Sequence, residues 1–283
     1  MFKRILLISG WLVVGIIVVV SLVNKRSKFF PKSLSEVKLT ESQIDERISR
    51  LEQEFRIGEN FEKDIELGIY YYLKGPKFYD KAINIFENIW RDGCLDERIF
   101  YYLGNMYEFL KLYNFATREY KKYLNNVKDD VEVKIRLANL YYLTKNINDA
   151  MALYESILSR DNKNVVSLSN IATIHFENKN YLEAEQYFLK VKDICKKLNI
   201  TEPKYVNFYL GKIKFINKDY KAAIDFFKRE LEINNERNVD VLTFLMNSFY
   251  EVKDYDSARE VAEKLIKISP KDKNIKKILN KKI

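Results

Sequence analysis

The chain has 283 residues, of which 47% are hydrophobic and 14% aromatic, and its formal net charge is +9. Eight dispersed glycines exclude a dinucleotide-binding or P-loop fingerprint, and one histidine with two cysteines cannot complete a zinc site from nitrogen and sulfur ligands alone. The first 33 residues hold six Lys or Arg and no Asp or Glu, so the rest of the chain carries only +3, which argues against a basic nucleic-acid groove. We therefore expect no catalytic residue, no metal, no cofactor, no small-molecule substrate and no nucleic acid.

The N-terminal tail 1–4 is followed by an uncharged apolar run at 5–23. A helix of that length reaches about 28 Å, which is enough for the hydrocarbon core of a bilayer. No small-x-small cleavage site follows the run, and no cysteine lies near it for lipid attachment. The sequence therefore predicts an uncleaved transmembrane anchor, Ile5 to Val23, rather than a signal peptide.

Basic residues flank this run on both sides, and the two ways of weighing them disagree. A strict count favours a cytoplasmic C-terminal part, because more Lys and Arg follow the run than precede it. A short basic start followed directly by an apolar run is, however, typical of a signal-anchor that leaves the C-terminal part outside the cytoplasm. We expect the second arrangement, in the bacterial inner membrane with the C-terminal domain periplasmic; a cytoplasmic domain is the alternative.

Residues 24–60 read as a basic linker and a leading helix. Thr40 and Gln43 resemble a capping box that opens a helix. An apolar stripe then continues at helical spacing through Ile44, Ile48, Leu51 and Phe55. The pattern predicts a helix at 40–56 that covers or leads into the next element, with a short coiled-coil stalk as the alternative.

From residue 61 onward, small and aromatic residues recur at fixed offsets. Three tetrads repeat every 34 positions: Gly104, Tyr107, Ala116 and Tyr120; Ala138, Tyr141, Ala150 and Tyr154; Ala172, His175, Ala184 and Phe188. A related set lies upstream, with two extra residues at the 74–77 turn, and another downstream, with five extra residues inside 193–203. A period of 34 with these occupants is the pattern of a helix-turn-helix repeat.

These residues resemble the tetratricopeptide repeat (TPR) family, and the resemblance covers roughly three quarters of the chain. It implies an all-α fold, a right-handed α-solenoid of about six repeats within 61–270, preceded by the transmembrane helix. The expected units are 61–96, 97–130, 131–164, 165–203, 204–238 and 239–270, followed by a capping helix at 271–283.

In this pattern the small residues let the two helices of a unit approach closely, and the aromatics fill the space between units. The only histidine, His175, stands where sister repeats have tyrosine, so we expect it to be packing material. Cys94 and Cys195 lie three repeats apart, too far for a disulfide in a stack where each unit touches its neighbours.

In the family, partners usually lie along the concave face made by the first helix of each unit. The fifth place of that helix holds no lysine here, which argues against clamping the C-terminal carboxylate of chaperones. Asparagines recur at the ninth place and aromatics at the twelfth, and these could hold a peptide backbone and an apolar segment. The predicted partner-binding residues are Tyr101, Asn105, Asn139, Tyr142, Phe176, Phe208, Lys212 and Asn247. We expect Asn105, Asn139, Tyr142, Phe176 and Asn247 to be substantially exposed.

These features predict a membrane-tethered adaptor without catalysis of its own. The first hypothesis is a scaffold in a bacterial envelope assembly, such as a secretion system or the periplasmic part of a flagellar motor. The alternative is a quality-control factor that holds exported polypeptides. Its partners would accordingly be envelope-complex subunits or unfolded polypeptides.

Overall fold

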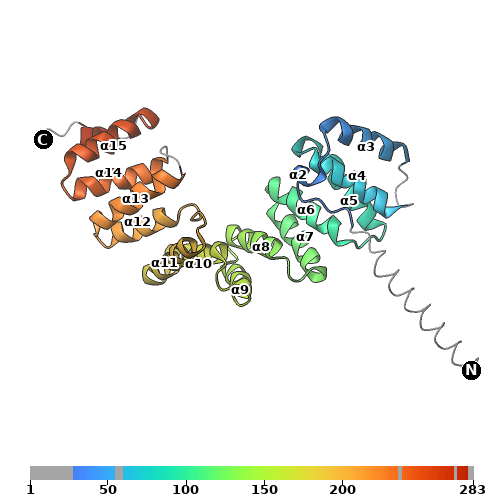
Figure 1. The fold of residues 1–283 in the computed structure, drawn as a ribbon, viewed down its shortest axis with the longest axis horizontal. Coiled ribbons are helices and arrows are strands. Elements are labelled where there is room, and N and C mark those ends of the chain that lie inside the picture. Colours follow the sequence, from blue (N-terminus) through green and yellow to red (C-terminus); the bar gives the residue numbers. More distant parts are fainter. Residues whose placement is uncertain (1–27, 55–59, 235–237, 271–272, 280–283) are drawn as a thin grey trace, which may run out of the picture. The chain divides into compact units, whose positions relative to one another are not determined.

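The computed structural model describes residues 28–54, 60–234, 238–270 and 273–279, and the regular structure of these residues is entirely helical (Figure 1). The chain divides into two compact units, unit 1 from Met1 to Lys128 and unit 2 from Asp129 to Ile283. The predicted anchor at 5–23 lies outside the described residues. Within them, no helix combines the length and apolarity needed to cross a bilayer.

Unit 1 contains a leading helix and two helix pairs. The helices are α2 (Leu34–Val37), α3 (Glu41–Glu54), α4 (Phe61–Leu73), the 3₁₀ turn η1 (Pro76–Phe78), α5 (Tyr79–Arg91), α6 (Glu97–Phe109) and α7 (Tyr113–Asn126). Helix α3 opens with the expected capping box, in which the backbone N–H of Thr40 donates to Gln43 Oε1 at 2.9 Å and the Gln43 N–H donates to Thr40 Oγ1 at 3.3 Å. Its residues Ile44, Ile48 and Leu51 are buried, and the helix packs on α4. These three residues of the stripe therefore cover the first repeat, and Phe55 lies outside the described residues.

Unit 2 contains four helix pairs and a short last helix. They are α8 (Val131–Leu143), α9 (Ile147–Leu158), α10 (Val165–Glu177), α11 (Tyr181–Leu198), α12 (Val206–Ile216), α13 (Tyr220–Asn234), α14 (Val239–Glu251), α15 (Tyr255–Ile268) and α16 (Lys273–Leu279). The extra residues in 193–203 lengthen α11 and its loop to α12. The carboxylate of buried Glu230 closes this loop by accepting N–H bonds from Tyr205 and Phe208.

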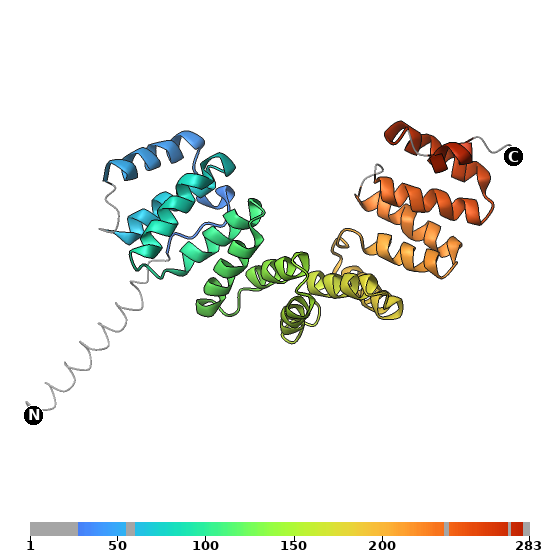
Figure 2. The same ribbon diagram turned by 180° about the vertical axis from the view of Figure 1, so that it is seen from behind.

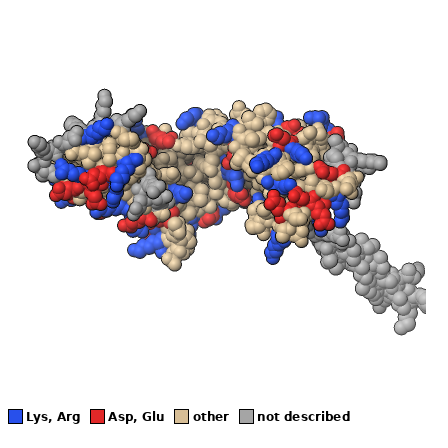
Figure 3. Space-filling view, turned by 90° about the horizontal axis from the view of Figure 1, so that it is seen from above, with Lys and Arg blue, Asp and Glu red and all other residues tan. Residues whose placement is uncertain are grey.

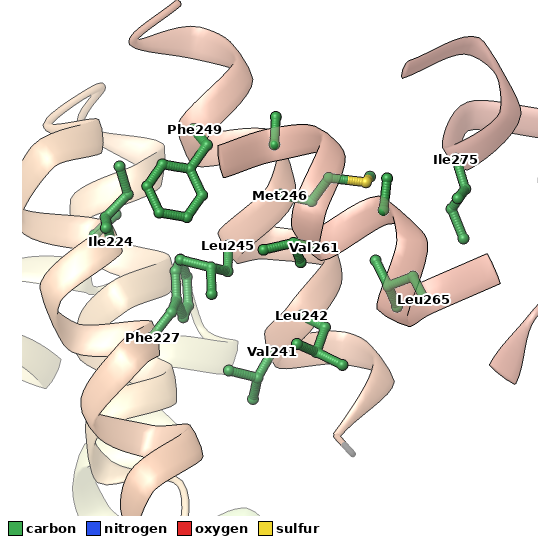
Figure 4. Packing of buried hydrophobic residues seen from close by; sticks show 13 residues of the cluster. Ile224, Phe227, Val241, Leu242, Leu245, Met246, Phe249, Val261, Leu265 and Ile275 are labelled. Atoms are coloured by element: carbon green, nitrogen blue, oxygen red, sulfur yellow. The ribbon is translucent and has the colours of Figure 1, made fainter. Parts of the chain in front are cut away.

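The last core layer of unit 2 is sealed by the C-terminal helix. Ile275 of α16 is 2% exposed and packs on the cluster that includes Met246 of α14 and Leu265 of α15 (Figure 4). Ile278 and Leu279 pack at its margin. The apolar face of this basic segment thus covers the end of the stack, as a terminal repeat requires.

Glycine or alanine stands where the two helices of several pairs approach closely. A Cβ built on Gly104 would lie 2.4 Å from the Tyr120 ring, and one on Gly211 would lie 2.5 Å from the Phe227 ring. Ala138 and Ala150 at the matching places of the next repeat are fully buried, with Tyr154 beside them in one cluster. The predicted role of these small residues, close helix approach, is confirmed.

Candidate functional site

The predicted partner residues of unit 1 are not available on the surface. Tyr101 is 1% exposed and Asn105 is 9% exposed, so the expectation that Asn105 is exposed was wrong. Asn105 is held inside the repeat because its Oδ1 accepts the Tyr120 hydroxyl at 2.8 Å. Tyr101 is covered by the chain itself, namely by the segment Lys28–Lys32.

This segment lies on the first-helix face of unit 1, the face that carries the predicted partner residues. In Figures 1 and 2 the chain between residue 28 and α2 runs beside α6. The Phe30 ring packs edge-on against Tyr101 at 5.0 Å and Tyr102 at 5.6 Å between centroids, and it reaches Tyr123 at 6.5 Å. We call the three tyrosines around the Phe30 ring the Phe30 site.

Two backbone carbonyls of the segment are bound by side chains of α6. The Tyr102 hydroxyl donates to the carbonyl of Pro31 at 2.7 Å, and Arg98 Nη1 donates to the carbonyl of Phe29 at 3.2 Å. Both donors are essentially unexposed. Burial raises the pKa of Tyr102 far above its usual range, so its hydroxyl remains a donor.

Ion pairs surround the same contact. Arg98 Nε donates to Asp96 at 2.9 Å and Arg98 Nη1 to Glu62 at 2.8 Å, while Lys28 Nζ donates to Asp96 at 2.8 Å and to Glu97 at 3.1 Å. Burial alone would raise the pKa of Asp96, but the hydrogen bonds from Arg98 and Lys28 outweigh it and lower the pKa to about 2. The buried guanidinium is thus matched by two carboxylates.

In unit 2, the predicted residues of α8 are tied into the repeat rather than free. Asn139 is half-buried, and its Oδ1 accepts the Tyr154 hydroxyl. Tyr142 is also half-buried, and burial followed by a hydrogen bond to Glu177 raises its pKa far above the usual range. Neither is substantially exposed, which is a second departure from the expectation. Both bonds lie within unit 2 and join α8 to another helix, α9 for Asn139 and α10 for Tyr142.

The structure brings Phe176, Phe208 and Lys212 together, on α10 and α12. The Lys212 ammonium lies 4.9 Å from the centroid of Phe176, 5.2 Å from Phe208, 5.4 Å from Phe244 and 6.0 Å from Tyr209. We call these five residues the Lys212 cluster. Among the described residues, no carboxylate forms an ion pair with Lys212. Its stabilisation comes from the ring faces, worth roughly 0.5–2 kcal/mol per good contact.

Asn247 lies three residues after Phe244, one turn further along α14. It is half-buried, and so is Phe176, so neither is as exposed as expected. Thus the structure clusters three of the eight predicted residues with two that sequence reasoning missed, Tyr209 and Phe244. Their signal in the sequence is an aromatic residue at the sixth place of two successive units.

Charge is mixed over the described surface. On the face drawn in Figure 3, Lys and Arg lie interspersed with Asp and Glu on both units. Several pairs are salt bridges within one helix, such as Arg136 with Glu132 at 3.2 Å. This agrees with the near-neutral balance of the repeat region.

Residues 165–199, which form the helix pair α10 and α11, match the family described as tetratricopeptide repeat. This helix pair is therefore a tetratricopeptide repeat. No curated protein matches the chain by sequence.

Several solved structures have a fold similar to that of this chain. PilF of Pseudomonas aeruginosa superposes with a TM-score of 0.61 at 14% identity, covering 85% of this chain and 100% of that one. PilW, a type IV pilus biogenesis factor, gives 0.56 at 16% identity, with 77% and 97% covered. A chain of the APC/C hetero-tetramer Cut9-Hcn1 gives a TM-score of 0.59 at 16% identity. The match covers 85% of the present chain but only 46% of that longer chain. At these identities the likeness shows the fold alone.

Nothing in the repeat pattern predicts the docked segment. Residues 28–32 fall within the predicted basic linker, and lysines stand at both of their ends. Their sequence, Lys-Phe-Phe-Pro-Lys, holds two adjacent phenylalanines that a solvated linker has no reason to carry. That excess of apolar area is the signal that could have revealed the docking.

Proposed function

We propose that this TPR protein is a scaffold that binds segments of other proteins on the first-helix face of unit 2, without catalysis of its own. The observation that carries the proposal is the Lys212 cluster. TPR arrays present such faces to partners, and the fold of the chain and its likeness to solved TPR structures support a protein-interaction scaffold.

The chemistry of the Lys212 cluster defines the partner segment. A half-buried ammonium held over four rings, with no carboxylate beside it in the described residues, favours an incoming Asp, Glu or chain-terminal carboxylate. The surrounding rings favour apolar side chains next to that acid. A partner would therefore present an acidic group flanked by apolar residues. Asn247 and Asn139 on neighbouring first helices would extend the contact along the same face.

We also propose that the protein is tethered to a bacterial inner membrane by Ile5 to Val23, with the repeats in the periplasm and a cytoplasmic placement as the alternative. The length of the apolar run and its basic flanks support this. The assembly it serves would be an envelope system such as a secretion system or a flagellar motor. One protein of similar fold, PilW, is described as a type IV pilus biogenesis factor, and that likeness is one of fold only.

A quality-control factor that holds exported polypeptides is the second candidate. It is favoured by the aromatic character of the same face, which tolerates many apolar segments. A scaffold retains one partner at fixed stoichiometry, whereas a holding factor retains many substrates. Quantitative mass spectrometry of material co-purified with the detergent-solubilised full chain distinguishes the two.

The decisive variant is Lys212→Gln, with Lys221→Gln as its charge-matched control. Lys221 is an exposed lysine on α13 that no contact ties to the Lys212 cluster. We expect Lys212→Gln to reduce partner recovery at least fivefold, about 1 kcal/mol, and Lys221→Gln to leave it unchanged. If Lys212→Gln folds normally and recovers the partner as well as wild type, the partner binds another surface. One such surface is the cavity of about 890 Å³ lined by residues such as Lys228, Leu245 and Lys264.

Anchoring has its own test. The full chain should remain with membranes after carbonate washing, and a chain starting at Ser27 should be released. A chain starting near Ser35 would instead lack the docked segment Lys28–Lys32 and expose its binding surface. Release of the full chain by carbonate would contradict the anchor without touching the role of the Lys212 cluster.

A further inference from the structure

We propose that unit 1 contains a peptide-recognition site and that its ligand is the chain's own Lys28–Lys32 segment, bound in cis. The site recognises an extended basic–aromatic–aromatic–proline sequence. It is distinct from the Lys212 cluster, and its existence does not depend on the function assigned to that cluster.

Every residue of the segment makes its own contact with the repeats or their rings. Lys28 pairs with Asp96 and Glu97, and Phe29 packs on Tyr70 at 5.3 Å between centroids. Phe30 enters the Phe30 site, Pro31 is buried, and the Lys32 ammonium lies 5.3 Å from the Tyr101 ring. Contacts at five consecutive positions define a sequence preference, whereas a linker that merely lies on a surface is fixed at one or two.

The backbone of the segment is recognised as well as its side chains. The carbonyls of Phe29 and Pro31 each accept a hydrogen bond from a buried side chain, Arg98 and Tyr102. Buried donors that face a surface need an acceptor, because leaving one unpaired costs about 1–3 kcal/mol. The two donors are aimed at carbonyls two residues apart, which is how a groove side chain binds an extended peptide.

The ligand is ordered in place by the turn that follows it. The Lys32 N–H donates to Glu36 Oε2 at 3.0 Å, and Ser33 Oγ donates to Glu36 Oε1 at 3.3 Å, which joins the segment to α2. A short tether gives the cis ligand an effective concentration in the millimolar range. A free peptide of the same sequence at micromolar concentration therefore cannot displace it.

The bound segment also shortens the connection to the preceding chain. Lys28 follows Val23 by five residues, which span at most about 18 Å when fully extended. If residues 24–60 were all free linker, the reach would be about 120 Å. With the proposed anchor, on which this consequence rests, docking holds the start of unit 1 at the membrane surface.

The test uses the full chain in detergent and a fluorescent peptide of residues 26–33, Arg-Ser-Lys-Phe-Phe-Pro-Lys-Ser. Phe30→Ala in the protein removes the central ring of the cis ligand but leaves every residue of the site intact. We expect this variant to bind the peptide saturably at micromolar concentration, and the wild-type chain not to bind it below about 100 µM. The control protein is Leu34→Ala, an exposed neighbour of the segment that should behave like wild type. The control peptide carries alanine at Phe30 and should bind neither.

Three results would overturn the proposal. Equal peptide binding by wild type and Phe30→Ala would mean that the segment does not fill the site in solution. Absence of binding by a folded Phe30→Ala chain would mean that the site does not recognise the sequence. A wild-type mass of two chains that falls to one in Phe30→Ala would assign the ligand to a second copy and overturn the cis arrangement.

A protease readout covers the case in which Phe30→Ala fails to fold. Trypsin should cut the wild-type chain slowly after Lys28 and Lys32. The variant Tyr102→Phe loses only the bond to the Pro31 carbonyl, and we expect trypsin to cut it at these sites at least about tenfold faster. Lys121, exposed on α7, serves as the internal reference cleavage site. Equal cleavage after Lys28 in wild type and Tyr102→Phe would contradict carbonyl recognition.

Discussion

In unit 1 the cation of the first-helix face, Arg98, is fully buried between Asp96 and Glu62 and beneath the Lys28–Lys32 segment. In unit 2 the cation of the same face, Lys212, is half-buried over four aromatic rings. The first cation has carboxylates and a carbonyl, and the second has only the partial negative charge of ring faces. One repeat architecture therefore supports a face that its own chain fills and a face to which we assign an acidic ligand as a proposal.

The difference follows from two cations at different places in the repeat. Arg98 stands at the second place of the unit 97–130, and Lys212 at the ninth place of the unit 204–238, where three sister repeats carry asparagine. A guanidinium can satisfy two carboxylates and a carbonyl at once because its donors form a planar fork. An ammonium on a flexible stem instead settles over ring faces. The choice of cation thus separates a structural contact from the contact that we propose for partner binding.

The largest expected effect is from Arg98→Ala. It should destabilise unit 1 by about 3 kcal/mol, because Asp96 keeps a charge that burial penalises and the Phe29 carbonyl loses its donor. Lys212→Ala should cost less than about 1 kcal/mol in unit 2. Trp90 fluorescence in a Trp11→Phe background reports unit 1, and labelling of Cys195, which is 1% exposed, reports unit 2. Equal destabilisation by the two variants would remove the contrast between the cations.

The next effect compares close helix contacts in the two units. Gly104→Ala should destabilise unit 1 by roughly 1–3 kcal/mol, because the new methyl group meets the Tyr120 ring. That ring cannot move freely, since its hydroxyl donates to Asn105 and Glu108. Gly211→Ala should cost only about 1 kcal/mol, because the Phe227 ring has no hydroxyl to hold it. The same two probes measure both, and a larger cost for Gly211→Ala would show that ring anchoring does not set the tolerance.

A third prediction concerns acid. The pKa of Asp96 lies at about 2 in the folded chain, below its usual value, so the unfolded chain binds more protons between pH 4 and 2. The ionised Asp96 carboxylate stabilises unit 1 above about pH 4. This contribution, about 1–2 kcal/mol of unfolding free energy, is lost as the pH falls towards 2. The groups facing it are Arg98, Lys28, Glu62 and Glu97, of which Glu62 also has a lowered pKa and reinforces the trend.

Asp96→Asn tests this directly, because asparagine keeps the N-cap of α6 while removing the titration. The variant should be less stable than wild type at pH 7, and the two should converge towards pH 2 when Trp90 fluorescence is followed. A constant difference across this range would show that the Asp96 carboxylate does not carry the acid response.

Sequence reasoning reached the repeats because the 34-residue spacing of Gly104, Ala138 and Ala172 encodes close helix contacts directly. It reached α3 because Thr40 and Gln43 form a capping box with a local, one-turn geometry. Sequence reasoning missed the docking of Phe30, because that contact joins positions about 70 residues apart and no periodic pattern in the sequence predicts it. It overestimated the exposure of Asn105 and Asn139, because their bonds to Tyr120 and Tyr154 depend on how the two helices of a pair are rotated.

The smallest effect should be equal in the two units, because it comes from a turn that both share. The turn between the helices of a repeat places a lysine in the left-handed region, with φ of 60° at Lys111 in unit 1 and 64° at Lys179 in unit 2. The following N–H groups bond back to the helix end, Leu112 to the Tyr107 carbonyl and Asn180 to the His175 carbonyl, in a Schellman-like arrangement. Glycine adopts this backbone without the Cβ strain that lysine bears, so Lys111→Gly and Lys179→Gly should each stabilise their unit by about 0.5–1 kcal/mol.

Lys121→Gly and Lys190→Gly, on the exposed sides of α7 and α11, are the matched controls and should destabilise by about 1 kcal/mol, because glycine is a poor helix former. Unfolding followed by Trp90 fluorescence and Cys195 labelling gives the sign in each unit. Destabilisation by Lys111→Gly or Lys179→Gly of the same size as their controls would mean that the turns store no strain, and opposite signs in the two units would mean that the shared turn is stabilised differently in each.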